Sequence, residues 1–301
     1  MMRTERLNPL NDFLFQKTFG EAGNEEQLLG LLNAILSECG RQYSAVMIRE
    51  NTRLTAEIVS DKTSILDVRA ILEGQTKANV EVQLRKNLNM DRRVLQYWSR
   101  EYSSGIGAGE DYIGLPGVIA VNIVGYEHDD DDLVHSSYHL WKDQRKDRLL
   151  TDSMEIHFID MVKFRRKRGA DMKNEALRRW LQYFDENSSD EELMEVLEMD
   201  AAIRKAYEAA ERVSMDKEQL RLYHMREMAI LDYNSNMNAF RREGKAEGLA
   251  EGRAEGLTEG IARGEAQAII AVAKKLLEQG VPFQQIVNST GLSEDEIRTL
   301  Q

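Results

Sequence analysis

The chain has few of the residues that cross-link or interrupt a fold. Its 301 residues include three prolines and one cysteine, Cys39. A single cysteine excludes a disulfide framework and a four-cysteine zinc site. The scarcity of proline predicts long secondary structure with few loops. No apolar run reaches the ~18 residues of a membrane-spanning helix, and the charged N-terminal segment does not resemble a signal peptide. We therefore expect a cytoplasmic protein that does not bind membranes.

Basic residues are outnumbered as well. The 40 Lys and Arg against 52 Asp and Glu give a formal net charge of −12. This excludes a uniformly basic nucleic-acid coat, although a local basic groove remains compatible with it. Hydrophobic residues at 42% and charged residues at 31% are typical of a foldable chain. Because the length exceeds the ~100–200 residues of a usual domain, we expect one substantial globular domain with an appended segment.

The first 170 residues predict an α/β domain. Asn11 or Asp12 could cap a first helix, and a second follows in NEEQLLGLLNAILSE, where leucines recur with helical spacing. After them come three strand-like runs, a helix and a further apolar strand. The expected strands cover residues 43–50, 64–73, 78–85, 116–126, 134–142 and 154–164, and the intervening helix covers 91–105. This order predicts a mixed sheet flanked by helices.

From about residue 171 the sequence becomes helical, and we divide it into three parts. Residues 171–242 contain no proline and predict helices or a protruding arm. Residues 243–264 form the second part, in which Glu-Gly recurs every four residues over 243–260. This repeat favours either close helix–helix approach and self-association or an exposed semi-flexible linker. Residues 265–301 predict three short helices similar to a helix-turn-helix. Their last helix is acidic, so a packing or pairing module is favoured over DNA readout.

Two acidic residues are expected to meet on a hairpin. If Gly74 lies at the centre of the turn between the second and third strands, Asp67 lies opposite Glu81, with Cβ atoms ~4.5–5.5 Å apart. Carboxylates that close repel each other unless a cation lies between them. Hard oxygen ligands of this kind suit Mg²⁺ or Mn²⁺. The alternative is a hairpin whose polar face meets water, with Arg69 and Arg85 neutralising the acids.

A basic and aromatic stripe is predicted on the following helix. Arg93, Tyr97 and Arg100 have the i, i+4, i+7 spacing of one helical face. Cations beside a carboxylate pair are what phosphodiester binding requires. The alternative is an ordinary solvated helix face.

A second basic cluster follows the last predicted strand, in the run KFRRKR at 163–168. It is either a solvated charge run or a grip on the DNA backbone, and we favour DNA contact because it offsets an otherwise acidic chain. The residues expected to bind DNA here are Lys163, Arg165 and Arg166. The acidic run EHDDDD at 127–132 is interpreted as a solvated excursion, with an acidic metal site as the alternative. The five histidines show no metal-ligand motif, and Cys39 is interpreted as a core residue.

These motifs resemble a known family. An aspartate on one strand, Asp67, followed by Glu81-Val82-Gln83 on the next, resembles the PD-(D/E)XK nuclease superfamily, with Gln83 at the position where many members carry lysine. Together with the opening NDFLFQKTFG, the Arg-x-x-x-Tyr helix and the Glu-Gly repeats, they are similar to the Rpn family of recombination-promoting nucleases. The resemblance covers about residues 5–165 well. It implies a restriction-endonuclease-like core with an all-α C-terminal extension.

The resemblance also implies a function, that of a Mg²⁺-dependent DNA endonuclease linked to recombination or transposition-like mobility. Asp67 and Glu81 would ligate Mg²⁺ or Mn²⁺, with the backbone carbonyl of Val82 as a third ligand. Gln83 can carry no charge, but it could orient the attacking water or a phosphate oxygen.

Supporting residues follow from the same resemblance. Arg69 or Arg93 would replace the missing lysine charge. Asp12 matches the family's N-terminal aspartate and would be an outer ligand, or else a helix cap.

Two further expectations concern assembly and an alternative function. A homo-oligomer, most simply a dimer formed through the C-terminal helices, would let two active sites address both DNA strands. The alternative is a catalytically inactive protein that keeps the nuclease fold, binds DNA or other proteins, and assembles through these helices. The acidic composition and Gln83 favour this alternative.

Overall fold

A computed structural model of the protein describes residues 6–49, 67–86, 88–107, 109 and 111–300. The strands are β1 (Val46–Arg49), β2 (Val68–Leu72), β3 (Lys77–Gln83), β4 (Val118–Val124), β5 (His135–Tyr138), β6 (Trp141–Lys142), β7 (Arg145–Leu149) and β8 (Met154–Asp160). The helices are α1 (Asp12–Phe19), α2 (Glu25–Leu36), α4 (Met90–Ser103), α5 (Met161–Lys167), α6 (Glu175–Phe184), α7 (Asp190–Met199), α8 (Ala201–Met215), α9 (Lys217–Glu278), α10 (Phe283–Thr290) and α11 (Glu294–Arg298). Short 3₁₀ turns are η1 (Ser37–Cys39), η2 (Glu73–Gln75) and η3 (Tyr112–Gly114).

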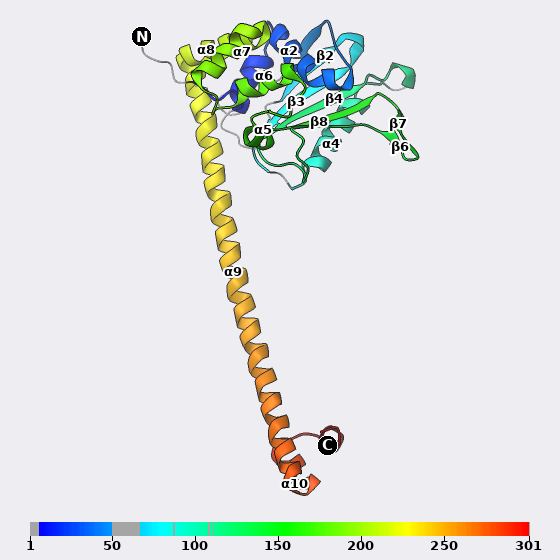
Figure 1. Ribbon diagram of the computed structural model, residues 1–301, viewed down its shortest axis with the longest axis vertical. Coiled ribbons are helices and arrows are strands. Elements are labelled where there is room, and N and C mark those ends of the chain that lie inside the picture. The colour runs from blue at the N-terminus through cyan, green and yellow to red at the C-terminus, as the bar shows by residue number, and fades with distance from the viewer. Residues whose placement is uncertain (1–5, 50–66, 87, 108, 110, 301) are drawn as a thin grey trace. The chain divides into compact units, whose positions relative to one another are not determined.

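Six strands form one mixed sheet in the order β1-β2-β3-β4-β8-β5 (Figure 1). β1, β2 and β3 pair antiparallel, β3, β4 and β8 pair parallel, and β5 is antiparallel to β8 at the edge. β6 and β7 form a separate two-stranded sheet that the sequence did not predict. The prediction of a mixed α/β core with an all-α C-terminal extension is confirmed.

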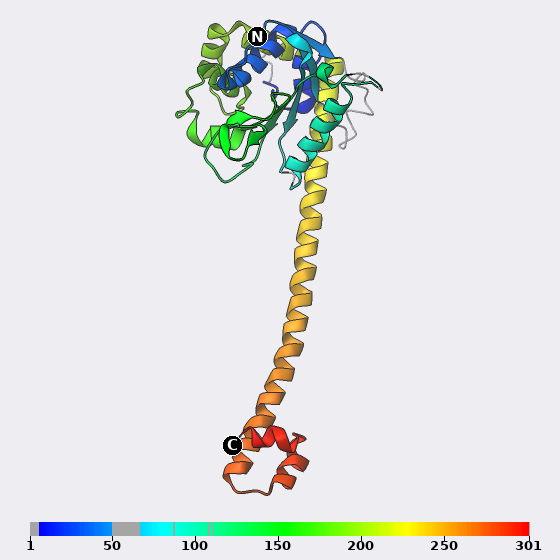
Figure 2. The same ribbon diagram turned by 90° about the vertical axis from the view of Figure 1, so that its right-hand side faces the viewer.

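Helices cover both faces of this sheet (Figures 1 and 2). On one face Val80 and Val82 of β3 belong to the large core that also contains residues of α1, α2, α6 and α8. On the other face Val94 of α4 packs in a smaller core with Ile156 of β8. Because successive side chains in a strand point to opposite faces, Glu81 points away from the large core and toward α4.

The strand predicted over 154–164 ends earlier, at Asp160. The Asp160 side chain accepts hydrogen bonds from the backbone N–H groups of Val162 and Lys163 and so caps α5. This cap stops the strand, because the backbone donors of the next residues are used in a helical turn. The basic run KFRRKR is consequently mostly helical.

Two other predicted strands also differ in extent. The strand predicted over 134–142 divides into β5 and β6 after Tyr138. The first residues of the strand predicted over 64–73, at 64–66, lie outside the described residues.

The chain forms two compact units, residues 1–231 and residues 232–301. The Glu-Gly repeat lies inside α9 and is helical. The separate helix expected from residue 265 is not observed, because α9 continues through it to Glu278. Alanine and glutamate, both strong helix formers, alternate with the glycines and offset their ~1 kcal/mol cost. The division of the chain at residues 170, 242 and 264 stays a prediction.

The last residues of the chain pack a small core of their own. Ala273, Ile286 and Ile297 are fully buried against one another. Ser293 caps α11 together with Glu296 in the capping box that the sequence predicts. Among the helices that the structure describes, none is long and apolar enough to cross a membrane.

Candidate functional site

The predicted acidic pair is brought together at the start of β2. The observed pairs Val68–Val80 and Arg69–Asn79 continue to a register in which Asp67 lies opposite Glu81, as the hairpin arithmetic predicts. Both carboxylates face α4, and both residues are buried, at 6% and 4% exposure. The alternative interpretation supposed that these acids lie on a face that meets water. Their burial contradicts it.

The turn of this hairpin explains why the register is fixed. Gly74 adopts φ +78° in η2 between the two strands. A left-handed backbone at this point favours glycine, since a Cβ would crowd the following carbonyl. Shifting the pairing by one residue would move the acids to the apolar face, so the core on that face also holds the register.

Each carboxylate has its own arginine. The Arg69 Nε atom donates to Asp67 Oδ2 at 2.9 Å, and the Arg93 Nη2 atom donates to Glu81 Oε1 at 2.5 Å. The guanidinium of Arg93 also lies over the ring of Tyr97, 5.4 Å from its centroid. Two residues of the predicted stripe on α4 therefore reach the acidic pair, one directly and one by supporting Arg93. Arg69 does neutralise Asp67, as the alternative interpretation supposed.

The electrostatics of the pair are those of a site that lacks positive charge. Burial raises the pKa of Glu81 above its ordinary value, the Arg93 guanidinium opposes this rise, and the nearby charge of Asp67 adds to it. Bringing two carboxylates out of water disfavours their charged forms. One arginine on each does not fully compensate at Glu81. A divalent cation between the two acids would supply the positive charge that is missing.

Gln83 and Val82 lie beside the pair on the same strand. Gln83 donates from Nε2 to the backbone carbonyl of Arg85 at 3.1 Å and accepts from Arg93 Nη1 at 3.4 Å. Its amide is thus oriented from both ends, with the oxygen directed to Arg93. Val82 buries its side chain in the large core, which leaves only its backbone carbonyl for any ligand role.

Asp12 is not the helix cap. Asn11 fills that position, accepting from the N–H groups of Phe13 and Leu14. Asp12, in the first turn of α1, is paired through both oxygens with Arg226 of α9, with a shortest separation of 2.6 Å. Arg226 is 3% exposed. No pattern in the sequence links two residues so far apart in the chain, and a role for Asp12 as an outer ligand stays a prediction.

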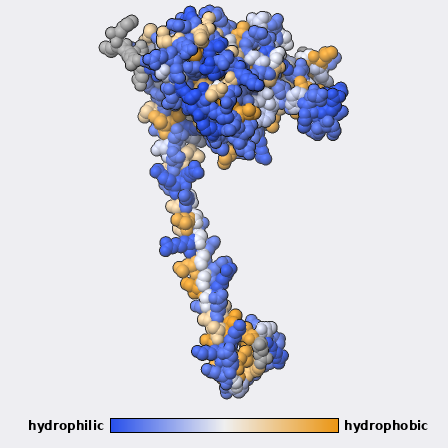
Figure 3. Space-filling model, viewed as in Figure 1, coloured by the Kyte–Doolittle hydropathy of each residue, from blue (hydrophilic) through white to orange (hydrophobic). Residues whose placement is uncertain are grey.

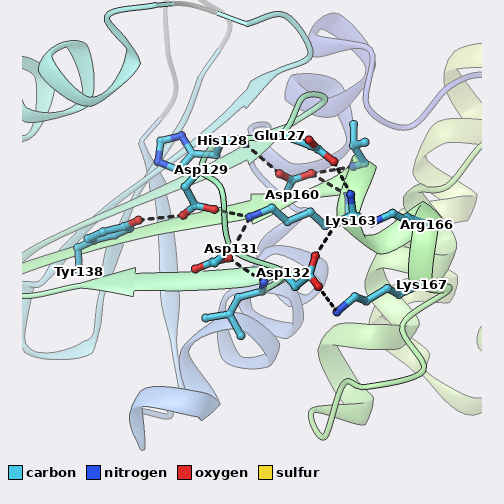
Figure 4. Close-up of polar contacts among 12 residues, drawn as sticks. Glu127, His128, Asp129, Asp131, Asp132, Tyr138, Asp160, Lys163, Arg166 and Lys167 are labelled. Atoms are coloured by element: carbon cyan, nitrogen blue, oxygen red, sulfur yellow. Dashed lines mark hydrogen bonds and ion pairs between the residues drawn. The ribbon is translucent and has the colours of Figure 1, made fainter.

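The second basic cluster is paired with the acidic run (Figure 4). The ion pairs are Lys163 with Asp129 and Asp131, Arg166 with Glu127 and Asp132, and Lys167 with Asp132. The acidic run is largely exposed, as expected. Its carboxylates are not simply solvated, however, because they form ion pairs with basic residues of α5.

These ion pairs bear on the residues of α5 that the sequence predicts to bind DNA. The Lys163 side chain is only 1% exposed, and Arg165 is paired with the buried Asp185 at 2.9 Å. Arg100, by contrast, is exposed on α4. DNA contact by Lys163, Arg165 and Arg166 stays a prediction, and it requires DNA to displace carboxylates of the chain itself.

Two family models match the chain. Residues 9–239 match the PD-(D/E)XK nuclease family transposase, and residues 266–301 match the Rpn/YhgA-like nuclease family, C-terminal HTH domain. No curated protein and no solved structure matches. The first match includes both acids and α4, and it covers more than half of the chain. The second agrees with the helix-turn-helix likeness of the tail, whereas the packing module that the sequence favoured there stays a prediction.

The raised pKa of Glu81 predicts a pH-dependent stability cost. A carboxyl whose pKa is higher in the folded chain than in the unfolded one (about 4.3) stabilises the fold at acid pH. That contribution is lost as the pH rises through the folded value. We expect Glu81→Gln, which cannot ionise, to gain stability relative to the unsubstituted protein as the pH rises from about 4 to about 7, by at most about 1.4 kcal/mol per pH unit.

Denaturant unfolding at each pH, in the presence of a chelator, measures this difference. The matched control is Glu195→Gln, at an exposed position of α7, which should show no such trend. If the unfolding free energies of the two variants depended on pH in the same way, the prediction would be contradicted.

Proposed function

The chain belongs to the PD-(D/E)XK nuclease family transposases, and from this premise we propose that it is a metal-dependent endonuclease that hydrolyses phosphodiester bonds in DNA. The observation that carries the proposal is the buried pair Asp67 and Glu81, opposed across two strands and flanked by Arg93. A structural ion pair alone would not require two acids on one face.

The donor set fits a hard divalent cation. Asp67 and Glu81 supply carboxylate oxygens, and the backbone carbonyl of Val82 is the candidate third ligand, which together suit Mg²⁺ or Mn²⁺. The raised pKa of Glu81 supports this assignment, since the site stabilises added positive charge. When bound, such an ion supplies Lewis-acid stabilisation of the scissile phosphate and makes water a better nucleophile.

The neighbouring residues position the reactants. Gln83 cannot act as a general base or supply charge, so it holds a water molecule or a phosphate oxygen by hydrogen bonds. Arg93 lies within reach of both Gln83 and Glu81, and its guanidinium supplies the positive charge that the family's lysine would bring. Arg69 has the same relation to Asp67.

DNA is the partner that this arrangement fits. Tyr97 and the exposed Arg100 continue the stripe of α4 away from the acidic pair, where they can contact backbone phosphates. Lys163, Arg165 and Arg166 extend the contact if DNA displaces their carboxylate partners. The match of the tail to an HTH domain supports a second contact with DNA. A role in recombination or transposition-like mobility follows from the family description.

A catalytically inactive member of the family is the second candidate. Gln83 in place of lysine and the arginine on each carboxylate favour it. This reading keeps the fold and the assembly but predicts no metal binding that depends on Asp67. Calorimetric titration with Mg²⁺ or Mn²⁺ distinguishes the two functions.

The acidic pair is tested by substitution. We expect Asp67→Ala and Glu81→Ala each to lower Mg²⁺-dependent nicking of supercoiled plasmid DNA by at least about 100-fold, because loss of an outer partner of a metal site already costs about 10–100-fold. Asp147→Ala, in the exposed strand β7, is the matched control. Circular dichroism checks the fold, and unchanged nicking by both site variants would refute the assignment.

The role of Arg93 is tested by charge relocation. Arg93→Ala should slow nicking by about 10²–10³-fold, the usual effect of removing one group that stabilises developing charge. Arg92→Ala, at the adjacent exposed position of α4, should have no effect. If Arg93 stands in for the family's lysine, Gln83→Lys should restore much of the rate in the Arg93→Ala background. A double variant as slow as Arg93→Ala alone would contradict this role.

We also propose that the protein is a homo-oligomer, most simply a dimer, assembled through α9. Along the repeat a Cβ on any glycine would meet no atom within 4 Å, so the backbone is open to a second helix. Leu249, Leu257 and Ile261 are exposed on the same segment, and Figure 3 shows apolar patches along it. Covering such apolar side chains with a second copy of the chain removes them from water, which stabilises the association.

Sedimentation equilibrium of the full chain measures this association. The double substitution Leu257→Glu and Ile261→Glu should convert the oligomer to monomer, since unpaired charge is costly to bury. Glu247→Gln, on the same helix, should leave the mass unchanged. A monomeric unsubstituted protein at all concentrations would rule out the proposal.

A further inference from the structure

A second cluster of chemically reactive side chains lies on the opposite face of the sheet from Glu81. Cys39 of η1 and Glu155 and His157 of β8 offer one sulfur, one oxygen and one nitrogen atom, all within 4.8 Å of one another. Glu155 and His157 are fully buried, and Cys39 is half-buried. The proposed nuclease function uses none of them.

The parity of the strands separates this cluster from the acidic pair. Glu81 pairs in register with Asn122, and Asn122 with Phe158, so these three side chains share the face toward α4. Glu155 and His157 are odd-numbered residues of the same strand and therefore point to the other face. An ion held there would be distinct from one held by Asp67 and Glu81.

Nitrogen atoms of three side chains surround the buried carboxylate of Glu155, but they do not all form hydrogen bonds with it. His157 Nε2 lies 2.9 Å from Glu155 Oε1, and His139 Nε2 lies 3.8 Å from the same oxygen. Arg41 Nε lies 3.1 Å from Oε2. Even so, among the residues that the structure describes, no donor meets Glu155 Oε2 in hydrogen-bond geometry. A buried carboxylate oxygen without a hydrogen bond is costly and indicates a group that could accept a further partner.

Behind His157 runs a line of hydrogen bonds. His157 Nδ1 lies 2.8 Å from His135 Nε2, and His135 Nδ1 lies 2.7 Å from Glu38 Oε2. With the contact to Glu155, four groups are joined by three hydrogen bonds that hold both imidazole rings in place.

The hydrogen bond behind His157 fits a metal ligand. A metal-bound histidine usually donates from its other nitrogen to a hydrogen-bond acceptor that fixes the ring, and His157 Nδ1 has His135 as such a partner.

We propose that Cys39, Glu155 and His157 form a zinc site, with His139 as the fourth ligand. Thiolate and imidazole together select Zn²⁺ over Mg²⁺. The ligand atoms of Cys39, Glu155 and His157 lie within 4.8 Å of one another, so small side-chain rotations bring them to about 3.3–3.8 Å, the ligand spacing of a tetrahedral ion at usual bond lengths. Binding releases the thiol proton of Cys39 to solvent, because the thiolate is the form that ligates a metal.

The site would be structural. Its ligands come from η1, from β8 and from the segment that follows the edge strand β5. Four protein ligands leave no open position for substrate, as in closed structural zinc sites. A groove lined by Glu38, Val134 and His135 lies on the outer side of the hydrogen-bonded line and gives solvent a path toward it.

Cobalt titration of the full chain tests the proposal. After chelation and dialysis, Co²⁺ should bind at this site in one equivalent with sulfur-to-cobalt charge-transfer absorption, and Zn²⁺ should abolish that absorption. Cys39 is the only cysteine in the chain, so it is the only protein source of such a band. Cys39→Ala should remove the band with an unchanged circular dichroism spectrum, and His135→Gln should weaken the affinity about 10–100-fold.

Two controls separate this site from others. Asp67→Ala should keep the charge-transfer band, which makes the result independent of the proposed nuclease function. His224→Gln, an exposed histidine of α9, should leave the Co²⁺ affinity unchanged. The proposal is overturned if the unsubstituted protein shows no charge-transfer band, or if His157→Gln and Glu155→Gln, folded by circular dichroism, bind Co²⁺ as tightly as the unsubstituted protein.

Discussion

The constraint on which the rest of this fold depends is the burial of two like charges side by side. Asp67 and Glu81 face each other at the start of a hairpin, each less than a tenth exposed. Such a pair persists only if cations reach it. Arg69 comes from the hairpin itself, whereas Arg93 requires α4 to lie across the sheet. The position of α4 is therefore fixed both by the ion pair of Arg93 with Glu81 and by the small core beneath the helix.

The alternation of side chains along the strands lets one sheet support two chemically different faces. On β3 the valines enter the large core while the intervening residues, Glu81 and Gln83, face α4. On β8 the alternation has the opposite consequence, because there the polar residues Glu155 and His157 point toward the side that carries η1. The parallel centre of the sheet is covered on both sides, so polar groups on either face are buried and each needs a specific partner.

Local features of this structure could be predicted from the sequence, whereas contacts between distant segments could not. The register of the hairpin followed from the position of Gly74, and the cap of α11 followed from the spacing of Ser293 and Glu296. The partner of Asp12, in contrast, is Arg226, 214 residues further along the chain.

The same limit applied to the charge runs and to the ligands of the proposed zinc site. An acidic run and a basic run, each typical of a solvated surface, turned out to pair with each other (Figure 4). Cys39 and His157 carried no motif because the ligands of the proposed zinc site come from separate elements. The sequence pattern indicates the face on which a side chain lies but not the segment that packs against it.

The arginines give the proposed nuclease a consistent account of how an acidic chain could bind a polyanion. Asp67 and Glu81 each have an arginine partner before any ligand arrives. A divalent cation taking the place of the guanidinium groups on Asp67 and Glu81 would release Arg93 from Glu81 and Arg69 from Asp67, while Arg69 would keep its ion pair with Glu101 at 3.6 Å. Phosphate oxygens are then the natural acceptors for them, because guanidinium binds phosphate and carboxylate in the same planar geometry. The charge of DNA would thus be met locally, by groups that the metal itself sets free, and the overall charge of −12 would weaken long-range attraction without preventing contact at the site.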